Sequence, residues 1–101
     1  MLNGGYILLD LTKYGDIADA DNKQITLTND EVNKFILAFS GKPLYLKFKY
    51  ATYEYAHFVN LRSDNLDGDI YFSILSYDQN TILGNMDLNV SNKTLTAYEF
   101  E

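Results

Sequence analysis

The feature that most constrains the fold is a single helical segment, residues 27–43, with recognisable signals at both ends. Thr28 is the expected N-cap, and Glu31 three residues later can complete a capping box. Gly41 and Pro43 then end the helix, because glycine takes the left-handed conformation and proline cannot continue a helix. Between the caps the apolar residues have the spacing of one helix face: Val32, Phe35, Ile36 and Phe39. A helix of about ten residues is not stable alone, so this face must pack on a sheet.

Beyond the helix, apolar and polar residues alternate, as in strands with one buried face. Turn-rich segments separate the alternating runs, so we expect neighbouring strands to pair antiparallel in a meander. The expected strands are residues 44–50, 55–61, 70–78, 81–90 and 94–100.

The residues before the helix predict a strand, a loop and a short edge strand. Residues 4–11 are nearly continuous apolar sequence, typical of a strand covered on both faces. Residues 12–23 are polar and acidic but lack the spacing of a calcium-binding loop, so we expect a solvated loop. Residues 24–28 form the edge strand. The predicted fold is one α+β domain over residues 1–101, mostly antiparallel: an N-terminal strand, one short helix, then a five-strand meander forming a small sandwich or half-barrel.

The hairpin of residues 42–62 has apolar residues at even positions in its first strand and at odd positions in its second. Its loop must therefore contain an even number of residues. A two-residue loop would be Ala51-Thr52, whereas such tight turns favour Asn or Gly, so we expect a four-residue loop, 51–54. This register places Phe48 opposite His57 and predicts a half-buried histidine with a structural role.

The sequence favours one length for the first of the two later turns but leaves the second turn open. The apolar residues on both sides of Asp78-Gln79-Asn80 occupy even positions, which favours a three-residue loop with Asn80 at positive φ. After Val90 two registers remain open. A three-residue loop would place Phe100 over Gly84, and a two-residue loop would not.

The net charge of −6 is distributed unevenly. Residues 42–62 carry four basic residues and one acidic residue, whereas residues 63–101 carry seven acidic residues and one basic residue. Nucleic-acid binding needs a net basic surface, so we expect a charge-complementary contact between copies of the chain, or with another protein. The hairpin also mixes lysines with aromatic residues, which interfaces favour. The interface candidates are Tyr45, Lys47, Lys49, Tyr53, Tyr55 and Phe58.

The sequence carries no pattern that predicts catalysis. It contains no cysteine and a single histidine, and no second histidine could complete a metal site. We therefore expect no catalytic residues, no cofactor and no bound metal. The apolar run near the start is too short to span a bilayer and follows no basic segment, so no membrane association is expected.

Three short stretches carry a resemblance. Gly4-Gly5-Tyr6 precedes an apolar strand ending in Asp10, Lys42-Pro43-Leu44 opens a strand, and Glu54-Tyr55 lies at a hairpin corner. With the chain length, these features resemble the small β-rich proteins encoded among the tail and other virion genes of phages and prophages of Gram-positive bacteria. The resemblance implies a structural or accessory role in the virion, in the tail, in the baseplate or beside a fibre. It also implies a homo-oligomer, such as a trimer, that binds other virion proteins and occupies the host cytoplasm during assembly.

A second interpretation is a small acidic inhibitor, encoded by a phage, that binds a host or defence protein. The acidic residues of 63–101 would then stand in for phosphate groups. The mass of the chain in solution separates the two hypotheses, because the virion role predicts an oligomer and the inhibitor a monomer.

Overall fold

The computed structural model of the chain describes residues 5–18 and 23–100. Within these residues, seven strands form one curled sheet with a single α-helix, in the order β1-β3-β4-β5-β6-β7-β2. The elements are β1 (Ile7–Asp10), the short 3-10 helix η1 (Thr12–Tyr14), β2 (Ile25–Thr26), α1 (Asn29–Phe39), β3 (Leu44–Tyr50), β4 (Tyr53–Arg62), β5 (Asp69–Ser76), β6 (Ile82–Asn89) and β7 (Thr94–Tyr98). The predicted α+β half-barrel with a five-strand meander is confirmed.

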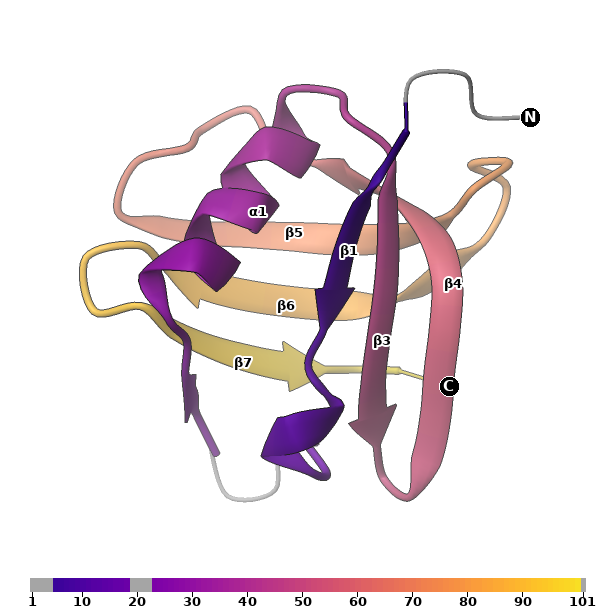
Figure 1. Ribbon diagram of the computed structural model, residues 1–101, viewed down its shortest axis with the longest axis horizontal. Helices are drawn as coiled ribbons and strands as arrows, with labels where there is room; N and C mark the ends of the chain where they lie inside the picture. The colour runs from indigo at the N-terminus through magenta and orange to yellow at the C-terminus, as the bar shows by residue number, and fades with distance from the viewer. Residues whose placement is uncertain (1–4, 19–22, 101) are drawn as a thin grey trace.

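The sheet folds back on itself as two layers: β1, β3 and most of β4 form the first layer, and β5, β6, β7 and β2 form the second. In Figure 1, β1 and β3 cross β5, β6 and β7 at a steep angle. The helix α1 lies beside β1 and packs against it. The long strand β4 joins the layers, because it pairs with β3 along Tyr53 to Val59 and with β5 only from Val59 to Arg62. The pairing of β1 with β3 is parallel, which requires a crossover connection, and the segment containing α1 provides it.

One end of the half-barrel is closed by the segment that follows η1. Asp16 forms a bridge with Lys49 at the end of β3, and Ala18 forms a bridge with Ala97 of β7. This short stretch therefore ties the first layer to the second. Asp19 and Asp21, which belong to the predicted acidic loop, lie outside the described residues.

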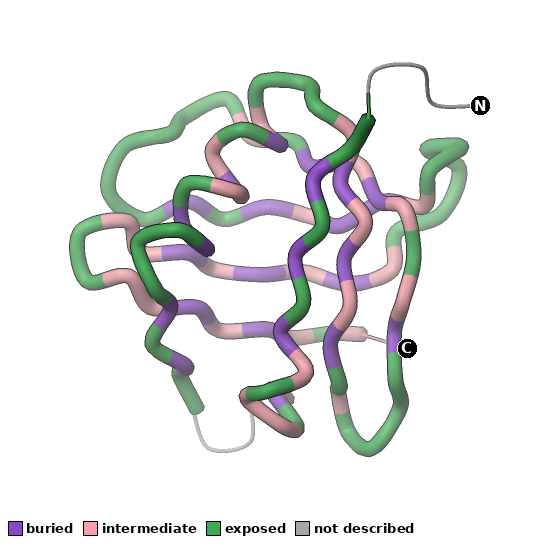
Figure 2. The backbone as a smooth tube through the Cα atoms, viewed as in Figure 1, coloured by how far each residue is buried: buried purple, intermediate pink, exposed green. Residues whose placement is uncertain are grey.

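The helix forms and docks as its sequence predicts. The Thr28 side chain accepts the Glu31 N–H at 3.2 Å, and the Glu31 carboxylate accepts the Thr28 N–H at 2.8 Å, so the capping box is complete. Phe35 is fully buried, with its ring 5.8 Å from the ring of Phe72 on β5. The apolar stripe of α1 thus packs into the space between the layers, where Figure 2 shows the buried positions of the strands.

The turn between β3 and β4 differs from the prediction. It has two residues, Ala51 and Thr52, rather than the four of the predicted loop 51–54, so Tyr50 pairs with Tyr53. Both turn residues have positive φ, 50° and 73°, as a two-residue hairpin turn requires. Such a conformation is unfavourable for Ala and Thr, but the Asp16 carboxylate accepts the Ala51 N–H at 2.9 Å and holds the turn.

The short turn changes which side chains meet. Phe48 lies opposite Tyr55, and their rings are stacked at 4.9 Å with an interplanar angle of 8°. His57 lies opposite Leu46 and is exposed. The prediction of a half-buried His57 opposite Phe48 is therefore wrong. The length of the turn sets the register, and a tertiary hydrogen bond from the turn to Asp16 stabilises a short turn that its own residues do not favour.

The turn between β5 and β6 follows the predicted register in part. Residues at even positions face each other as far as Ile74, which lies opposite Gly84. An irregularity between Ile74 and Leu75 then shifts the pairing. Positive φ falls on Gln79 rather than on Asn80.

The turn between β6 and β7 resolves a register that the sequence left open. Four residues, 90–93, separate Asn89 from its partner Thr94, so neither of the two loops considered is present. Phe100 nevertheless lies over Gly84: a Cβ atom at Gly84 would overlap the Phe100 ring. The positive φ of Glu99 lies directly before Phe100. The ring also contacts Phe48 at 4.9 Å, so it joins the two layers.

Candidate interaction surfaces

The outer side of the first layer carries a continuous row of rings, which we call the aromatic face. Ring centroids lie 4.9 Å apart for Tyr45 and Phe58, 5.2 Å for Tyr6 and Phe58, and 5.5 Å for Phe58 and Tyr77. Leu8 of β1, which is 49% exposed, lies next to Tyr45 in the sheet. The aromatic face thus consists of Tyr6, Leu8, Tyr45, Phe58 and Tyr77.

Strand alternation and turn length together create this face. Leu44, Leu46 and Phe48 point into the core, so the residues between them point outward. The two-residue turn then sets Phe58 directly opposite Tyr45. The predicted loop 51–54 would have set Asn60 there instead.

The six interface candidates do not all lie on this surface. Tyr45 and Phe58 form its centre, and Tyr53 stands at the hairpin end with 69% of its surface exposed. Tyr55 is buried and stacked on Phe48 within the core, so it does not belong to an outer contact surface.

The two remaining candidates, Lys47 and Lys49, lie further along the outer side of β3. Lys47 Nζ is 4.0 Å from a carboxylate oxygen of Asp10 on β1. Lys49 is directly opposite Glu54 on β4. Each lysine therefore has an acidic residue beside it, and the basic stretch of the sequence becomes a surface of mixed charge.

A shallow hollow adjoins the aromatic face. Its volume is about 450 Å³, and His57, Phe58, Tyr77, Asp78 and Leu83 are among its lining residues. The exposed His57 contributes to its rim.

The outer side of the second layer has a different character. We call it the acidic face and define it by Asp69, Tyr71, Asn85, Asp87 and Tyr98. Tyr71 is directly opposite Asp87, and Asn85 is directly opposite Tyr98, so all four point to the same side.

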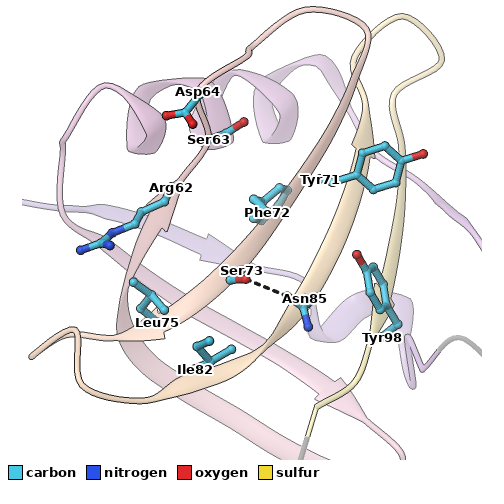
Figure 3. Close-up of a pocket in the computed structure, with 10 residues that line it drawn as sticks. All are labelled: Arg62, Ser63, Asp64, Tyr71, Phe72, Ser73, Leu75, Ile82, Asn85 and Tyr98. Carbon is cyan, nitrogen blue, oxygen red and sulfur yellow. Dashed lines mark hydrogen bonds between the residues drawn. The ribbon is translucent and has the colours of Figure 1, made fainter.

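A concavity of about 640 Å³ opens on the acidic face. In Figure 3, Tyr71 and Tyr98 stand on one side of it, and Arg62 and Asp64 on the other. Its floor includes Ser73, whose hydroxyl donates to the Asn85 side-chain oxygen at 2.7 Å.

The electrostatics of the acidic face centre on Asp87. Its Oδ1 atom is buried and has no hydrogen-bond partner within the described part of the chain. Burial, and secondarily the charge of Asp69, raise the pKa of Asp87. Burial and the nearby charges of Glu99 and Asp87 likewise raise the pKa of Tyr98. Among residues 5–18 and 23–100, no lysine or arginine forms an ion pair with Asp69, Asp87 or Glu99.

A buried acid elsewhere in the fold has a structural explanation. The Tyr14 hydroxyl donates to Glu31 Oε1 at 2.5 Å, and Lys13 Nζ lies 3.2 Å from Oε2. Burial raises the pKa of Glu31, but hydrogen bonds from Thr28, Tyr14 and Lys13 outweigh it, so the net pKa is lowered. Burial and this hydrogen bond raise the pKa of Tyr14 to about 12. The sequence indicated only the helix-capping role of Glu31, because Tyr14 and Lys13 reach it through tertiary packing.

The described residues were also considered for a metal centre and for a membrane-spanning helix. Within residues 5–18 and 23–100, no three His, Cys, Asp or Glu side chains are grouped so that they could hold a metal ion. The only described α-helix, α1, is too short and too polar to cross a membrane.

Comparisons of this chain with protein-family models, with curated protein sequences and with solved structures gave no significant match.

Proposed function

We propose that the chain is a non-enzymatic assembly module, which binds other protein chains through the aromatic face. The observation that carries this proposal is the unbroken row of ring contacts from Tyr6 through Tyr45 and Phe58 to Tyr77 on an outer sheet surface. Covering these exposed rings with a partner is favourable, because it removes contiguous apolar surface from water.

The composition of this face also suits an interface. Tyrosine and phenylalanine are enriched in the centres of protein–protein interfaces, and tyrosine tolerates water before the partner arrives. Tyr6, Leu8 and Tyr77 are each about half exposed, at 50%, 49% and 46%. The hollow beside Tyr77 offers a partner side chain a place to enter.

A second copy of the chain is the partner that we favour. The rim beside the aromatic face carries both signs of charge, with Lys47 beside Asp10 and Lys49 beside Glu54. Two copies could therefore meet with opposite charges facing each other. A charge contact between the hairpin and an acidic surface of a neighbouring copy stays a prediction, and the acids beside the lysines reduce the attraction expected for it.

The place of this module in a phage particle is a proposal that rests on the sequence resemblance. The tail, the baseplate and fibre-associated assemblies are the candidate locations, with other virion proteins as further partners. The alternative proposal, a small acidic inhibitor of a host or defence protein, is favoured by one observation: Asp69 and Asp87 of the acidic face form no ion pair with a lysine or arginine among the described residues.

Sedimentation velocity and light scattering of the full chain test the proposal. We expect the wild-type chain to exceed the mass of a single copy and Phe58→Ser to reduce it, because the change removes the ring that the others share. Leu37→Ser is a matched control, since Leu37 is a half-exposed apolar residue on α1, away from this face. A monomeric wild-type chain, or equal losses from both variants, would contradict the proposal.

A further inference from the structure

We infer that the concavity on the acidic face binds a neutral oligosaccharide. The sugar rings stack on Tyr71 and Tyr98, and their hydroxyl groups exchange hydrogen bonds with a row of polar side chains that crosses the concavity. This site goes beyond the proposed function, because it lies on the other layer of the sheet and takes a small ligand rather than a protein chain.

The first support is this row of polar side chains. Strand pairing sets Arg62 of β4 opposite Ser73, Ser73 opposite Asn85, and Asn85 opposite Tyr98. Directly opposed residues point to the same side of a sheet, and all four line the concavity (Figure 3). Four neighbouring strands at the usual spacing span about 14 Å, which gives room for more than one sugar ring.

The second support is that internal hydrogen bonds hold this row in place. The Ser73 hydroxyl donates to Asn85 Oδ1 at 2.7 Å, and Asn85 Nδ2 donates to Glu99 Oε2 at 3.2 Å. Arg62 donates to the side-chain oxygen of Gln79. The serine hydroxyl still has acceptor capacity, the amide has a second N–H, and a guanidinium has further N–H donors. The row therefore offers both donors and acceptors, which suits sugar hydroxyls because each hydroxyl both donates and accepts.

The third support is the exposed apolar surface that borders the row. Tyr71 precedes Ser73 by two residues on β5 and is 64% exposed, and Ile82, another lining residue, is 59% exposed. The faces of a sugar ring carry C–H bonds, which pack favourably on the negative face of an aromatic ring. A sugar thus has the same two kinds of surface as the concavity, polar hydroxyl edges and apolar faces.

The charges around the concavity favour a neutral ligand. Among the described residues that line it, Arg62 is the one cation and Asp64 the one acid. Asp87, directly opposite Tyr71, disfavours an anionic ligand such as a phosphate, and Arg62 disfavours a cationic one. The volume of about 640 Å³ lies within the range of small-molecule sites. Both β5 and β6 are paired on their two sides, so an extended peptide finds no free strand edge between them.

An NMR titration of the full chain tests the site. The probes are cellotriose and triacetylchitotriose, whose equatorial substituents leave flat C–H faces free to stack. We expect saturable shifts of the Ser73, Asn85 and Tyr98 amide resonances with at least one probe, at a Kd of about 1 mM. Because the ligand is neutral, added salt should leave this Kd unchanged.

Three variants locate the binding. Tyr71→Ser should weaken it about tenfold, because it removes a ring on which a sugar face packs. Tyr71→Phe keeps that ring and should change the Kd by less than about threefold. Tyr53→Ser is the matched control, since Tyr53 is a tyrosine of similar exposure, 69%, at the end of the β3–β4 hairpin in the other layer. It should leave binding unchanged.

Each outcome decides the inference. Selective weakening by Tyr71→Ser, with shifts centred on the row, supports it. Absence of shifts with either probe up to about 20 mM would overturn it. Equal weakening by Tyr71→Ser and Tyr53→Ser, or shifts centred on Tyr45 and Phe58, would also overturn it. A hexapeptide of glycine and serine that shifts the same amides as strongly would overturn it too, because the concavity would then not select sugars. The proposed self-association is measured separately by mass, so one proposal can fail without the other.

Discussion

The aromatic face and the acidic face are the outer sides of two layers of one sheet, and each carries tyrosines. They differ in whether the charged side chains near those tyrosines have a partner of opposite charge. On the aromatic face the rings contact one another, and Lys47 lies beside Asp10. On the acidic face Tyr71 and Tyr98 flank Asp87, which has no cation beside it among the described residues. The difference teaches that residue type alone does not define a binding surface. Tyr45 lies among other rings and close to a paired lysine, whereas Tyr71 lies opposite a carboxylate that has no cation beside it among the described residues.

The largest expected effect is a difference in stability between substitutions on the inner and on the outer side of the β3–β4 hairpin. Phe48→Ala should lower the free energy of unfolding by about 3–5 kcal/mol, because it leaves a cavity between Tyr55 and Phe100. Phe58→Ala, on the outer side, should cost about 1 kcal/mol. Urea denaturation of both variants measures the difference. Equal losses would mean that the ring of Phe58 belongs to the core of the single chain, and the aromatic face would no longer count as a free surface.

An intermediate effect is expected at the turn that creates the aromatic face. Replacing Ala51 by Asn and Thr52 by Gly should raise the free energy of unfolding by about 1 kcal/mol, because both new residues tolerate positive φ. The ring contact of Tyr45 with Phe58 should persist, since the register is unchanged. Asp16→Ala is the opposing control and should destabilise the chain, because it removes the acceptor for the Ala51 N–H. A loss of stability in the Asn-Gly variant, measured by thermal unfolding, would argue against the two-residue turn.

The smallest effect concerns the unpaired acid of the other face. The pKa of Asp87 is raised above its ordinary value of 3.8, so the folded state disfavours the ionised carboxylate. An acidic group whose pKa is raised in the folded state destabilises the fold at pH values above its unfolded pKa. This destabilisation disappears as the pH falls and the group becomes protonated. Asp87→Asn should therefore raise the free energy of unfolding by about 0.5 kcal/mol at pH 7, and the gain should fade towards pH 4. If the variant is instead less stable at pH 7, Asp87 has a stabilising partner and the contrast between the faces is lost.

Features that depend on local chemistry were predictable. The start of α1 follows from Thr28 and Glu31, which pair across three residues of one chain segment. The alternation of apolar residues identified five strands and the meander, because the side-chain period of a strand does not depend on its partners. The same alternation placed Tyr45 and Phe58 on an outer side before any neighbour was known.

Features that depend on distant residues were decided by the tertiary structure. The turn at Ala51 and Thr52 looked unfavourable, and Asp16, 35 residues away from Ala51, provides the hydrogen bond that holds it. That turn fixes the register, and the register decides whether Tyr45 meets Phe58 or Asn60.

The charges follow the same division. The sequence by itself determined that residues 42–62 are basic and residues 63–101 acidic, because these are counts along the chain. Only the folded sheet brought Asp10 beside Lys47 and left Asp87 without an ion-pair partner in the described part of the chain. The physical reason is that electrostatic interaction falls with distance in space, and strand pairing, not sequence separation, sets that distance.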